Sequence, residues 1–336
     1  MTKMIMKMKM KMKKIEMRIS DILSKIKQSE KIGITFHTSP DGDSLGSALA
    51  LLIGLRKLNK QAYIISKEVV PQTFLYLPFS HEINGETSEP LKHTDCVIVL
   101  DCGDFKRINA NLCLENREFA LINMDHHLSN ELYGDLNYVD TSASAVAEIV
   151  YEVLRLLDVK LDKEVSTCLY TSLITDTGSF RHSSTTAVTH AIAGELINSG
   201  IDFSNIHRII FENKKFEKIK FYGEVISNMT VEHNGRVCIM YIPKNLVDKY
   251  NLVSEDTSDV ITFGSSIDTV EVTMLIKEVE DGVKVSLRSK SLVNVSKVAE
   301  VFNGGGHIRA AGFFTKGNFH DTTVKLMEIL EKELIK

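Results

Sequence analysis

Carboxylates and imidazoles, the side chains that bind divalent metals and transfer protons, recur directly after apolar stretches of this sequence. The most compact group is Asp125-His126-His127, which follows the apolar run 121–124. A carboxylate beside two imidazoles suits Mn, Fe or Zn better than Ca or Mg alone. This tripeptide carries little weight by itself, but residues of the same kind follow other apolar segments: His37, Asp41, Asp43, Asp101 and Asp176.

These residues come from separate segments of the chain, so a fold that gathers them also crowds their carboxylates together. At about 4 Å, each like-charged pair costs about 4 kcal/mol for an effective dielectric of about 20. Two divalent cations cancel four such charges, and a pair of cations is a common device for activating water against phosphorus. Asp101 and Asp176 are the natural shared ligands. Taken singly, Asp41-Gly42-Asp43 is typical of a turn, but the repeated coincidence along the chain favours a two-metal site.

The elements that would position these residues alternate between strands and helices. We expect strands at 31–36, 61–66, 96–101 and 121–124, and helices at 45–58, 147–157, 163–174 and 185–199. The polar residues follow the carboxyl ends of the strands, where open α/β sheets bind their ligands. We therefore predict an α/β domain over residues 15–202, with a mainly parallel sheet flanked by helices.

The pattern changes in the second half of the chain. Residues 203–228 are charged and helical, which predicts a linker helix. Over 229–336 the apolar period becomes two, and both Asn234-Gly235 and Asp281-Gly282 lie between apolar runs. These dipeptides favour hairpins, with a type I′ turn at Asn234-Gly235. We predict a smaller α+β domain with a mixed or antiparallel sheet.

Composition limits the class of protein. The chain has 336 residues, 43% hydrophobic and 25% charged, with a formal net charge of −4. Broad electrostatic capture of long nucleic acid is therefore not expected. Five scattered cysteines without a Cys-x-x-Cys pair favour a reduced, cytoplasmic compartment. Residues 1–14 alternate Met and Lys, which predicts a disordered tail and lacks the apolar core of a signal peptide or a membrane span.

The ordered set of motifs resembles the DHH phosphoesterase superfamily, whose namesake tripeptide is Asp125-His126-His127. His37 to Asp43 is similar to the family's first motif, Asp101 to its second and Asp176 to its fourth. The resemblance implies two divalent metal ions, usually Mn²⁺. It implies one ion held by His37, Asp41, Asp101 and Asp176, and another held by Asp43, Asp101, His126 and Asp176. It also implies catalytic roles for Asp101, Asp125 and His127, the last two by supporting the ligands or contacting phosphate.

The second domain carries a further resemblance. Gly304-Gly305-Gly306-His307 with Ala310-Ala311-Gly312 is similar to the signature of the associated DHHA1 domain. Glycines let main-chain amides approach an anion, and an arginine after a strand can hold a terminal phosphate through two N–H groups. A merely flexible loop is the alternative. We expect a substrate-binding site made by Arg288, Ser289, Asn303, Gly304, Gly305, Gly306, His307 and Arg309.

Within the superfamily, the two-domain chain resembles the nanoRNase and pAp-phosphatase group, also described as bifunctional oligoribonuclease and PAP phosphatase. This implies hydrolysis of very short oligoribonucleotides, or dinucleotides such as pApA, to mononucleotides, and removal of the 3′-phosphate of pAp. The alternatives are a cyclic di-AMP phosphodiesterase and a family II-like inorganic pyrophosphatase. A non-catalytic nucleotide sensor ranks last, because every expected ligand is present. A homodimer is a further expectation, whereas long duplex nucleic acid and membranes are not expected as partners.

Overall fold

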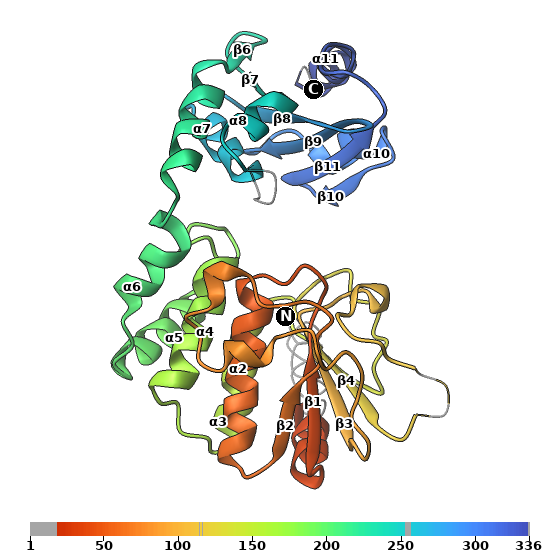
Figure 1. Cartoon of the computed structure of the whole chain (residues 1–336), viewed down its shortest axis with the longest axis vertical. Helices are drawn as coiled ribbons and strands as arrows, with labels where there is room; N and C mark the ends of the chain where they lie inside the picture. Colours follow the sequence, from red (N-terminus) through yellow and green to blue (C-terminus); the bar gives the residue numbers. More distant parts are fainter. Residues whose placement is uncertain (1–18, 114, 116, 253–256, 335–336) are drawn as a thin grey trace, which may run out of the picture. The chain divides into compact units, whose positions relative to one another are not determined.

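The structure, a computed structural model, describes residues 19–113, 115, 117–252 and 257–334, which form two compact units (Figure 1). The first unit ends at Asn213 and the second begins at Lys214. Around this division the chain forms three short helices, α6 (Phe203–His207), the π-helix η4 (Arg208–Glu212) and α7 (Phe216–Ser227). The role of the segment 203–228 as a linker stays a prediction, as do the domain limits. The predicted tail at 1–14 lies outside the described residues.

A five-stranded parallel sheet organises the first unit, in the strand order β2-β1-β3-β4-β5. The strands are β1 (Lys31–Thr35), β2 (Gln61–Ile64), β3 (Cys96–Leu100), β4 (Ala120–Asp125) and β5 (Leu136–Val139). The helices are one over 19–28, α2 (Gly42–Lys57), α3 (Val146–Leu156), α4 (Lys163–Asp176) and α5 (Ala187–Asn198). Short 3₁₀ turns are η1 (Gln72–Phe74), η2 (Ser80–Glu82) and η3 (Phe105–Arg107). The predicted α/β fold with a parallel sheet and flanking helices is confirmed.

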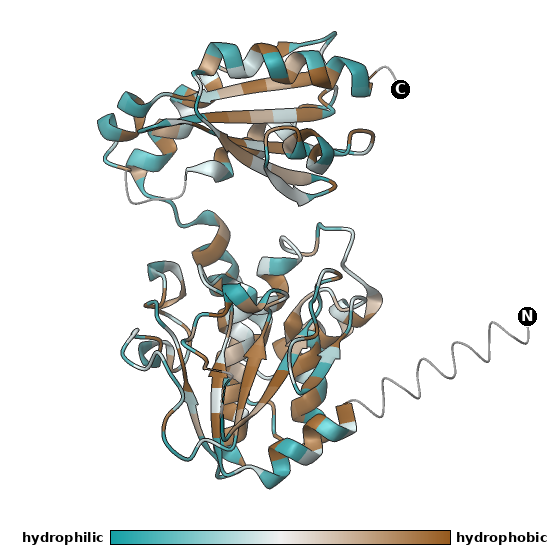
Figure 2. Ribbon diagram, turned by 90° about the vertical axis from the view of Figure 1, so that its right-hand side faces the viewer, coloured by the Kyte–Doolittle hydropathy of each residue, from teal (hydrophilic) through white to brown (hydrophobic). Residues whose placement is uncertain are grey.

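Both faces of this sheet are covered, which explains the unbroken apolar runs of its strands. All five residues of β3 are buried. Ile98 and Leu100 belong to the core that contains α2 to α5, whereas Val97 and Val99 pack with Ile108 of the loop after β3. Figure 2 shows the apolar residues concentrated in the strands and along the inner sides of the helices. The carboxyl ends of the strands are therefore the part of the sheet left for ligands.

Helix α2 begins at Gly42, earlier than the predicted start at residue 45. The Asp41 carboxylate accepts hydrogen bonds from the main-chain N–H groups of Asp43 and Ser44, both at 3.1 Å, and the Ser44 hydroxyl accepts one from the N–H of Asp41. This capping box satisfies the first free N–H groups of the helix and outweighs the low helix propensity of Gly42. Asp43 therefore lies in the first turn of a helix and not in a loop.

Close packing of α2 against α4 brings two distant parts of the chain together. A Cβ atom at Gly46 of α2 would overlap the carbonyl oxygen of Cys168 in α4. Glycine is therefore needed for this approach of the two helices. Because of it, Ser172 and Asp176 near the end of α4 lie beside the start of α2.

The second unit is built on a six-stranded sheet in the order β10-β11-β9-β8-β7-β6, in which only β7 and β8 pair in parallel. The strands are β6 (Thr230–Glu232), β7 (Val237–Ile242), β8 (Val272–Val279), β9 (Gly282–Ser289), β10 (Gly305–His307) and β11 (Ala310–Thr315). The helical segments are α8 (Lys244–Lys249), η5 (Ser258–Val260), α9 (Ile261–Ser265), α10 (Val295–Glu300) and α11 (Phe319–Leu334), besides α7. The predicted mixed sheet is confirmed.

The first predicted hairpin of this unit forms, with the predicted turn inside a longer loop. Glu232 pairs with Val237, so the loop between β6 and β7 has four residues and not two. His233, Asn234 and Gly235 all have positive φ. Asn234 and Gly235 have φ values of 55° and 88°, and the N–H of Arg236 donates to the carbonyl oxygen of His233 at 3.2 Å, as in the predicted type I′ turn. The left-handed His233 lengthens the loop around this turn.

Among the helices of the described part of the chain, none is both long and apolar enough to cross a membrane.

Candidate metal centre

The predicted metal ligands meet at the carboxyl end of the parallel sheet, beside a cavity of about 390 Å³. Its lining includes His37 after β1, Asp101 after β3, His127 after β4 and Asp176 at the end of α4. Three groups of side chains within the described residues bring ligand atoms close enough to share an ion. The groups are His37, Asp41 and Asp101; Asp43, His126 and Asp176; and Asp101, Asp125, His126 and His127.

The first group surrounds the ring of His37. Its Nδ1 donates a hydrogen bond to the carbonyl oxygen of Thr38 at 2.9 Å, since a carbonyl can only accept. Its Nε2 lies 3.6 Å from Asp41 Oδ1 and 3.4 Å from Asp101 Oδ2. The main chain thus fixes the ring with Nε2 toward two carboxylates, which is how metal-binding histidines are commonly oriented.

The second group surrounds His126 in the same manner. Its Nδ1 donates to the carbonyl oxygen of Ala143 at 3.1 Å. Its Nε2 lies 3.8 Å from Asp43 Oδ2, 3.7 Å from Asp101 Oδ1 and 3.7 Å from Asp176 Oδ2. The imidazole therefore faces three carboxylates from three different elements.

Asp101 stands between the two groups and is the best candidate for a shared ligand. One of its oxygens faces His37 and the other faces His126. Asp101 is 3% exposed, and its Oδ1 makes no hydrogen bond to any described residue. Its φ of 54° is left-handed, a conformation that costs about 1–3 kcal/mol in a residue other than glycine. A buried, strained and unpartnered carboxylate oxygen among imidazoles fits a cation. Asp176 is the other expected shared ligand, but its carboxylate comes close enough to share an ion only with Asp43 and His126 among the three groups.

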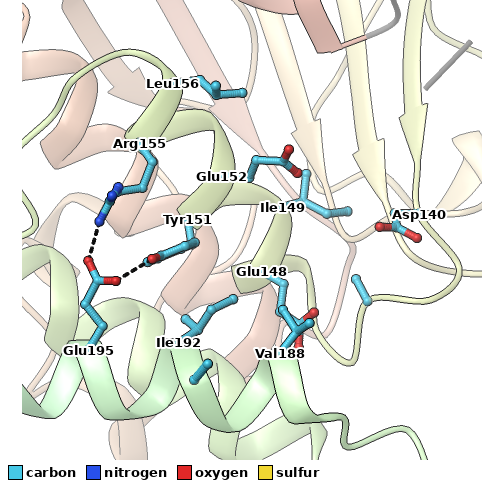
Figure 3. A pocket seen from close by; sticks show the side chains of 12 residues that line it. Asp140, Glu148, Ile149, Tyr151, Glu152, Arg155, Leu156, Val188, Ile192 and Glu195 are labelled. Carbon is cyan, nitrogen blue, oxygen red and sulfur yellow. Dashed lines mark hydrogen bonds and ion pairs between the residues drawn. The ribbon is translucent and has the colours of Figure 1, made fainter. Parts of the chain in front are cut away.

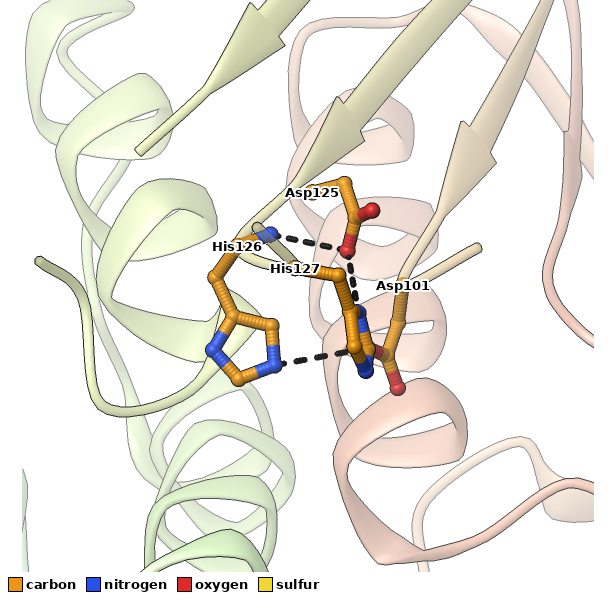
Figure 4. Close-up of side chains that lie close together, drawn as sticks. All are labelled: Asp101, Asp125, His126 and His127. Carbon is orange, nitrogen blue, oxygen red and sulfur yellow. Dashed lines mark hydrogen bonds and ion pairs between the residues drawn. The ribbon is translucent and has the colours of Figure 1, made fainter. Parts of the chain in front are cut away.

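Asp125 orients His127 instead of pointing at the cavity. Its Oδ1 accepts hydrogen bonds from His127 Nδ1 and from the main-chain N–H of His126, both at 2.8 Å (Figure 4). Its Oδ2 accepts one from Asn130 Nδ2 at 2.5 Å. Because Nδ1 is engaged, Nε2 of His127 is the ring nitrogen left for the cavity.

The pKa values express how strongly this site attracts positive charge. Burial raises the pKa of Asp101 to about 7, with a further contribution from Asp43, and burial with Asp176 raises the pKa of Asp43 to about 7. Burial lowers the pKa of His37, but hydrogen bonds to Asp101 and Asp41 outweigh it and raise that pKa to about 10. Protons thus balance the carboxylates when no cation is present, and divalent cations would replace them.

Several residues that sequence reasoning missed support this site. Asp43 accepts hydrogen bonds from Ser172 Oγ at 2.5 Å, Ser47 Oγ at 3.1 Å and the main-chain N–H of Val146 at 2.9 Å. Asn130 holds Asp125, as described above. The spacing of Ser47, four residues after Asp43 on one helix face, was a readable signal. The approach of Ser172 depends on the packing of two helices and leaves no trace in sequence.

In the second unit, part of the predicted substrate-binding set gathers at one edge of the sheet. His307 pairs with Ala310, and Ala310 pairs with Arg288, so His307 and Arg288 share one face with a small residue between them. Ser289 Oγ donates to the carbonyl oxygen of Val293 at 2.7 Å. The guanidinium of Arg309 donates to the carbonyl oxygens of Val293 and Ser291. Ser289 and Arg309 thus hold the neighbouring loop, and their contact with substrate stays a prediction.

The three glycines at this edge of the sheet, Gly304, Gly305 and Gly306, do not all serve the same purpose. A Cβ at Gly306, whose φ is 140°, would lie 2.5 Å from the carbonyl oxygen of Ala310. A Cβ at Gly304 would overlap the carbonyl oxygen of Gly312. Both glycines are therefore required for strand packing, and residues 305–307 form β10 where a loop was expected. Gly305 has open space around it, so its surroundings leave room for an anion.

A larger cavity, of about 500 Å³, lies between α3 and α5 (Figure 3). Glu195 accepts hydrogen bonds from Tyr151 and Arg155 there, both at 2.6 Å. None of the predicted metal ligands lines this cavity. The smaller cavity, at the carboxyl ends of the parallel strands, is therefore the one that the predicted ligands line.

Comparison with known proteins agrees with this arrangement. The model of the DHH family, N-terminal domain, matches residues 31–173, and the DHHA1 domain model matches residues 234–333. The chain is 30% identical to the bifunctional oligoribonuclease and PAP phosphatase NrnA of Thermus thermophilus, over 90% of each protein. It is 33% identical to the probable bifunctional oligoribonuclease and PAP phosphatase NrnA of Streptococcus mutans, over 87% of this chain and 91% of that protein.

Among solved structures, an exopolyphosphatase-related protein from Bacteroides fragilis superposes with a TM-score of 0.82 and 26% identity. The match covers 95% of this chain and 96% of that one. Both domain models and the full-length relatives thus point the same way. The chain belongs to the DHH family of phosphoesterases, in the group with a DHHA1 domain that includes proteins named bifunctional oligoribonuclease and PAP phosphatase.

Proposed function

We propose that this protein hydrolyses very short oligoribonucleotides, and dinucleotides such as pApA, to mononucleotides, and that it also removes the 3′-phosphate of pAp. The observation that supports this most directly is the buried carboxylate of Asp101, unpartnered at Oδ1 and placed between two imidazoles. The names of the relatives support the class of substrate.

We propose that the cofactor is a pair of divalent cations, and that Mn²⁺ suits a mixed set of oxygen and imidazole ligands. His37, Asp41 and Asp101 would hold one ion, and Asp43, Asp101, His126 and Asp176 would hold the other. When bound, such ions lower the pKa of a water ligand and polarise a phosphoryl oxygen.

The chain's own groups orient the reactants. His37 and His126 are fixed by main-chain carbonyls, so their Nε2 atoms stay directed at the carboxylates. The hydrogen bond that His127 donates to Asp125 raises the pKa of His127 to about 9, so in the metal-free protein this ring is positively charged at pH 7. Its free Nε2 would donate a hydrogen bond to a phosphate oxygen in the cavity. His127, oriented by Asp125, would thus bind the substrate phosphate, and neither residue would serve as a metal ligand.

We also propose that the second unit holds a terminal phosphate of the substrate. Arg288 and His307 lie on one face of the sheet across Ala310, and the neighbouring Gly305 is open. An anion above Ala310 would be within reach of both side chains. Such a site would recognise the end of a chain.

A substrate panel tests the proposal. Purified protein with Mn²⁺ is incubated separately with pApA, pAp, cyclic di-AMP, pyrophosphate and oligoadenylates of increasing length. We expect rapid cleavage of pApA and of the shortest oligomers, release of phosphate from pAp, and slow cleavage of long chains. Fastest turnover of cyclic di-AMP would assign the phosphodiesterase alternative. Rapid hydrolysis of pyrophosphate without any nucleotide cleavage would overturn the proposal.

The cytoplasmic location and the homodimer stay predictions of their own. All five cysteines are free and four are buried, which suits a reducing compartment. Cell fractionation tests the location, and sedimentation of the purified protein tests the oligomeric state.

A further inference from the structure

One arginine lines the acidic cavity. Among the described residues that line it, the carboxylates are Asp41, Asp101, Asp104, Glu131 and Asp176. Arg107 is the single arginine or lysine in that lining. It is exposed at the surface, so its guanidinium is accessible to a ligand.

The main chain of Arg107 is tied to a metal-binding loop. Its carbonyl oxygen accepts a hydrogen bond from the N–H of Thr38 at 2.7 Å, directly after His37. The next residue, Ile108, forms an antiparallel bridge with His37. Arg107 also ends the turn η3, which the Asp104 carboxylate caps by accepting the N–H of Lys106 at 2.8 Å. The base of the Arg107 side chain is therefore fixed relative to His37 and Asp101.

The guanidinium of Arg107 has its N–H donors available. It makes no hydrogen bond or ion pair with any residue that the structure describes, although Asp104 and Glu131 line the same cavity. Other arginines of this unit are paired: Arg56 holds both oxygens of Glu82, at 2.5 and 2.7 Å, and Arg117 bonds Asp135 at 2.6 Å. An unpaired arginine on a fixed turn beside the reaction site has its donors free for substrate.

We propose that Arg107 binds the phosphate group that reacts, donating N–H groups to its non-bridging oxygens. This rests on the proposed function. A phosphodiester entering the cavity meets several carboxylates, and its negative charge increases as a hydroxide adds to phosphorus. A planar guanidinium can donate two parallel N–H groups to two phosphate oxygens, and as a group it is always positively charged. Its attraction grows with the developing charge, so Arg107 stabilises the transition state more than the bound substrate.

The test compares Arg107→Gln with Lys106→Gln, a matched loss of one exposed cation from the same turn that does not line the cavity. Arg107→Lys is the conservative variant. Substrates are pApA, ApA, which lacks the 5′-phosphate, and bis(4-nitrophenyl) phosphate. We expect Arg107→Gln to lower kcat/KM by about 100-fold for all three, mostly in kcat. Arg107→Lys should recover part of this loss. Melting temperature and the number of bound Mn²⁺ ions should match those of Lys106→Gln.

Each other outcome has a defined meaning. A loss confined to pApA would place Arg107 at the terminal phosphate and overturn the proposal. Equal kcat/KM for Arg107→Gln and Lys106→Gln would overturn it as well, and so would a loss of bound Mn²⁺. If the wild-type protein cleaves only pyrophosphate, the proposed function fails, yet the same comparison on pyrophosphate still tests Arg107. If it cleaves none of these, calorimetry of inorganic phosphate with Mn²⁺ decides: about tenfold weaker binding to Arg107→Gln supports the proposal, and equal binding overturns it.

Discussion

Replacing Asp43 by asparagine should make the metal-free protein more stable while it weakens metal binding. Asp43 is 1% exposed and accepts hydrogen bonds from Ser47, Ser172 and the N–H of Val146. An asparagine keeps all three, because its oxygen can face Val146 and both serine hydroxyls can accept from its NH₂ group. The substitution therefore removes one buried negative charge with little other change.

The size of the effect follows from the pKa of Asp43, which burial and Asp176 raise from 3.8 to about 7. That difference corresponds to about 4 kcal/mol against the folded, ionised state. Loss of the charge also removes a partner of His126, so we expect a net gain of about 2 kcal/mol at pH 8. The Asp43 carboxyl binds its proton more tightly in the folded state than in the unfolded chain. The stability of the wild-type protein therefore falls as pH rises from about 4 to about 7. The gain should therefore disappear near pH 4.

The assay is calorimetric melting at pH 4 and pH 8, with EDTA or with Mn²⁺. At pH 8 in EDTA, Asp43→Asn should melt about 4–8 °C above wild type. Added Mn²⁺ should raise the melting temperature of wild type far more than that of the variant. Asp202→Asn is the control, since Asp202 caps α6 on the surface and asparagine caps equally well. A lower melting temperature for metal-free Asp43→Asn at pH 8, or an unchanged response to Mn²⁺, would refute the reasoning.

Three further predictions concern other sites. Asp101→Ala should abolish turnover at saturating Mn²⁺ but keep the melting temperature of the metal-free protein within a few degrees, and retained activity would contradict its role as a shared ligand. His307→Ala should raise KM for pApA far more than it lowers kcat. A larger effect on kcat than on KM would instead assign His307 a role in the chemical step. Glu271 accepts the N–H groups of Ser291, Leu292 and Val293, and these outweigh burial to lower its pKa. Its contribution is present above the unfolded pKa and lost as pH falls through the lower folded one. Glu271→Gln should thus cost about 2 kcal/mol at pH 7 and less in acid, and an equal loss at both pH values in unfolding experiments would contradict this.

The meeting of the predicted metal ligands was predictable because these residues follow short motifs at the ends of apolar strands. His37, Asp101 and His126 each follow such a strand, and the parallel sheet brings those ends to one edge. The apolar periodicity that reveals the strands therefore also locates their ends. Where Asp43 lies was harder to predict, because the Asp41 capping box extends α2 toward it.

The supporting contacts could not be predicted, because they depend on packing between distant segments. Ser172 reaches Asp43 only because α4 approaches α2 closely at Gly46. Arg309 looked like a substrate contact in sequence, but its guanidinium donates to two main-chain carbonyls. Arg107 gave no signal, since neither its unpaired state nor its place beside the cavity can be read from neighbouring residues.

The most direct test of the two-ion site is anomalous diffraction from crystals of the protein grown with Mn²⁺. We predict two peaks, one against His37, Asp41 and Asp101 and the other against Asp43, His126 and Asp176, with Asp101 touching both ions. A single peak, a peak outside the cavity, or ligand side chains turned away from the ions would contradict the account.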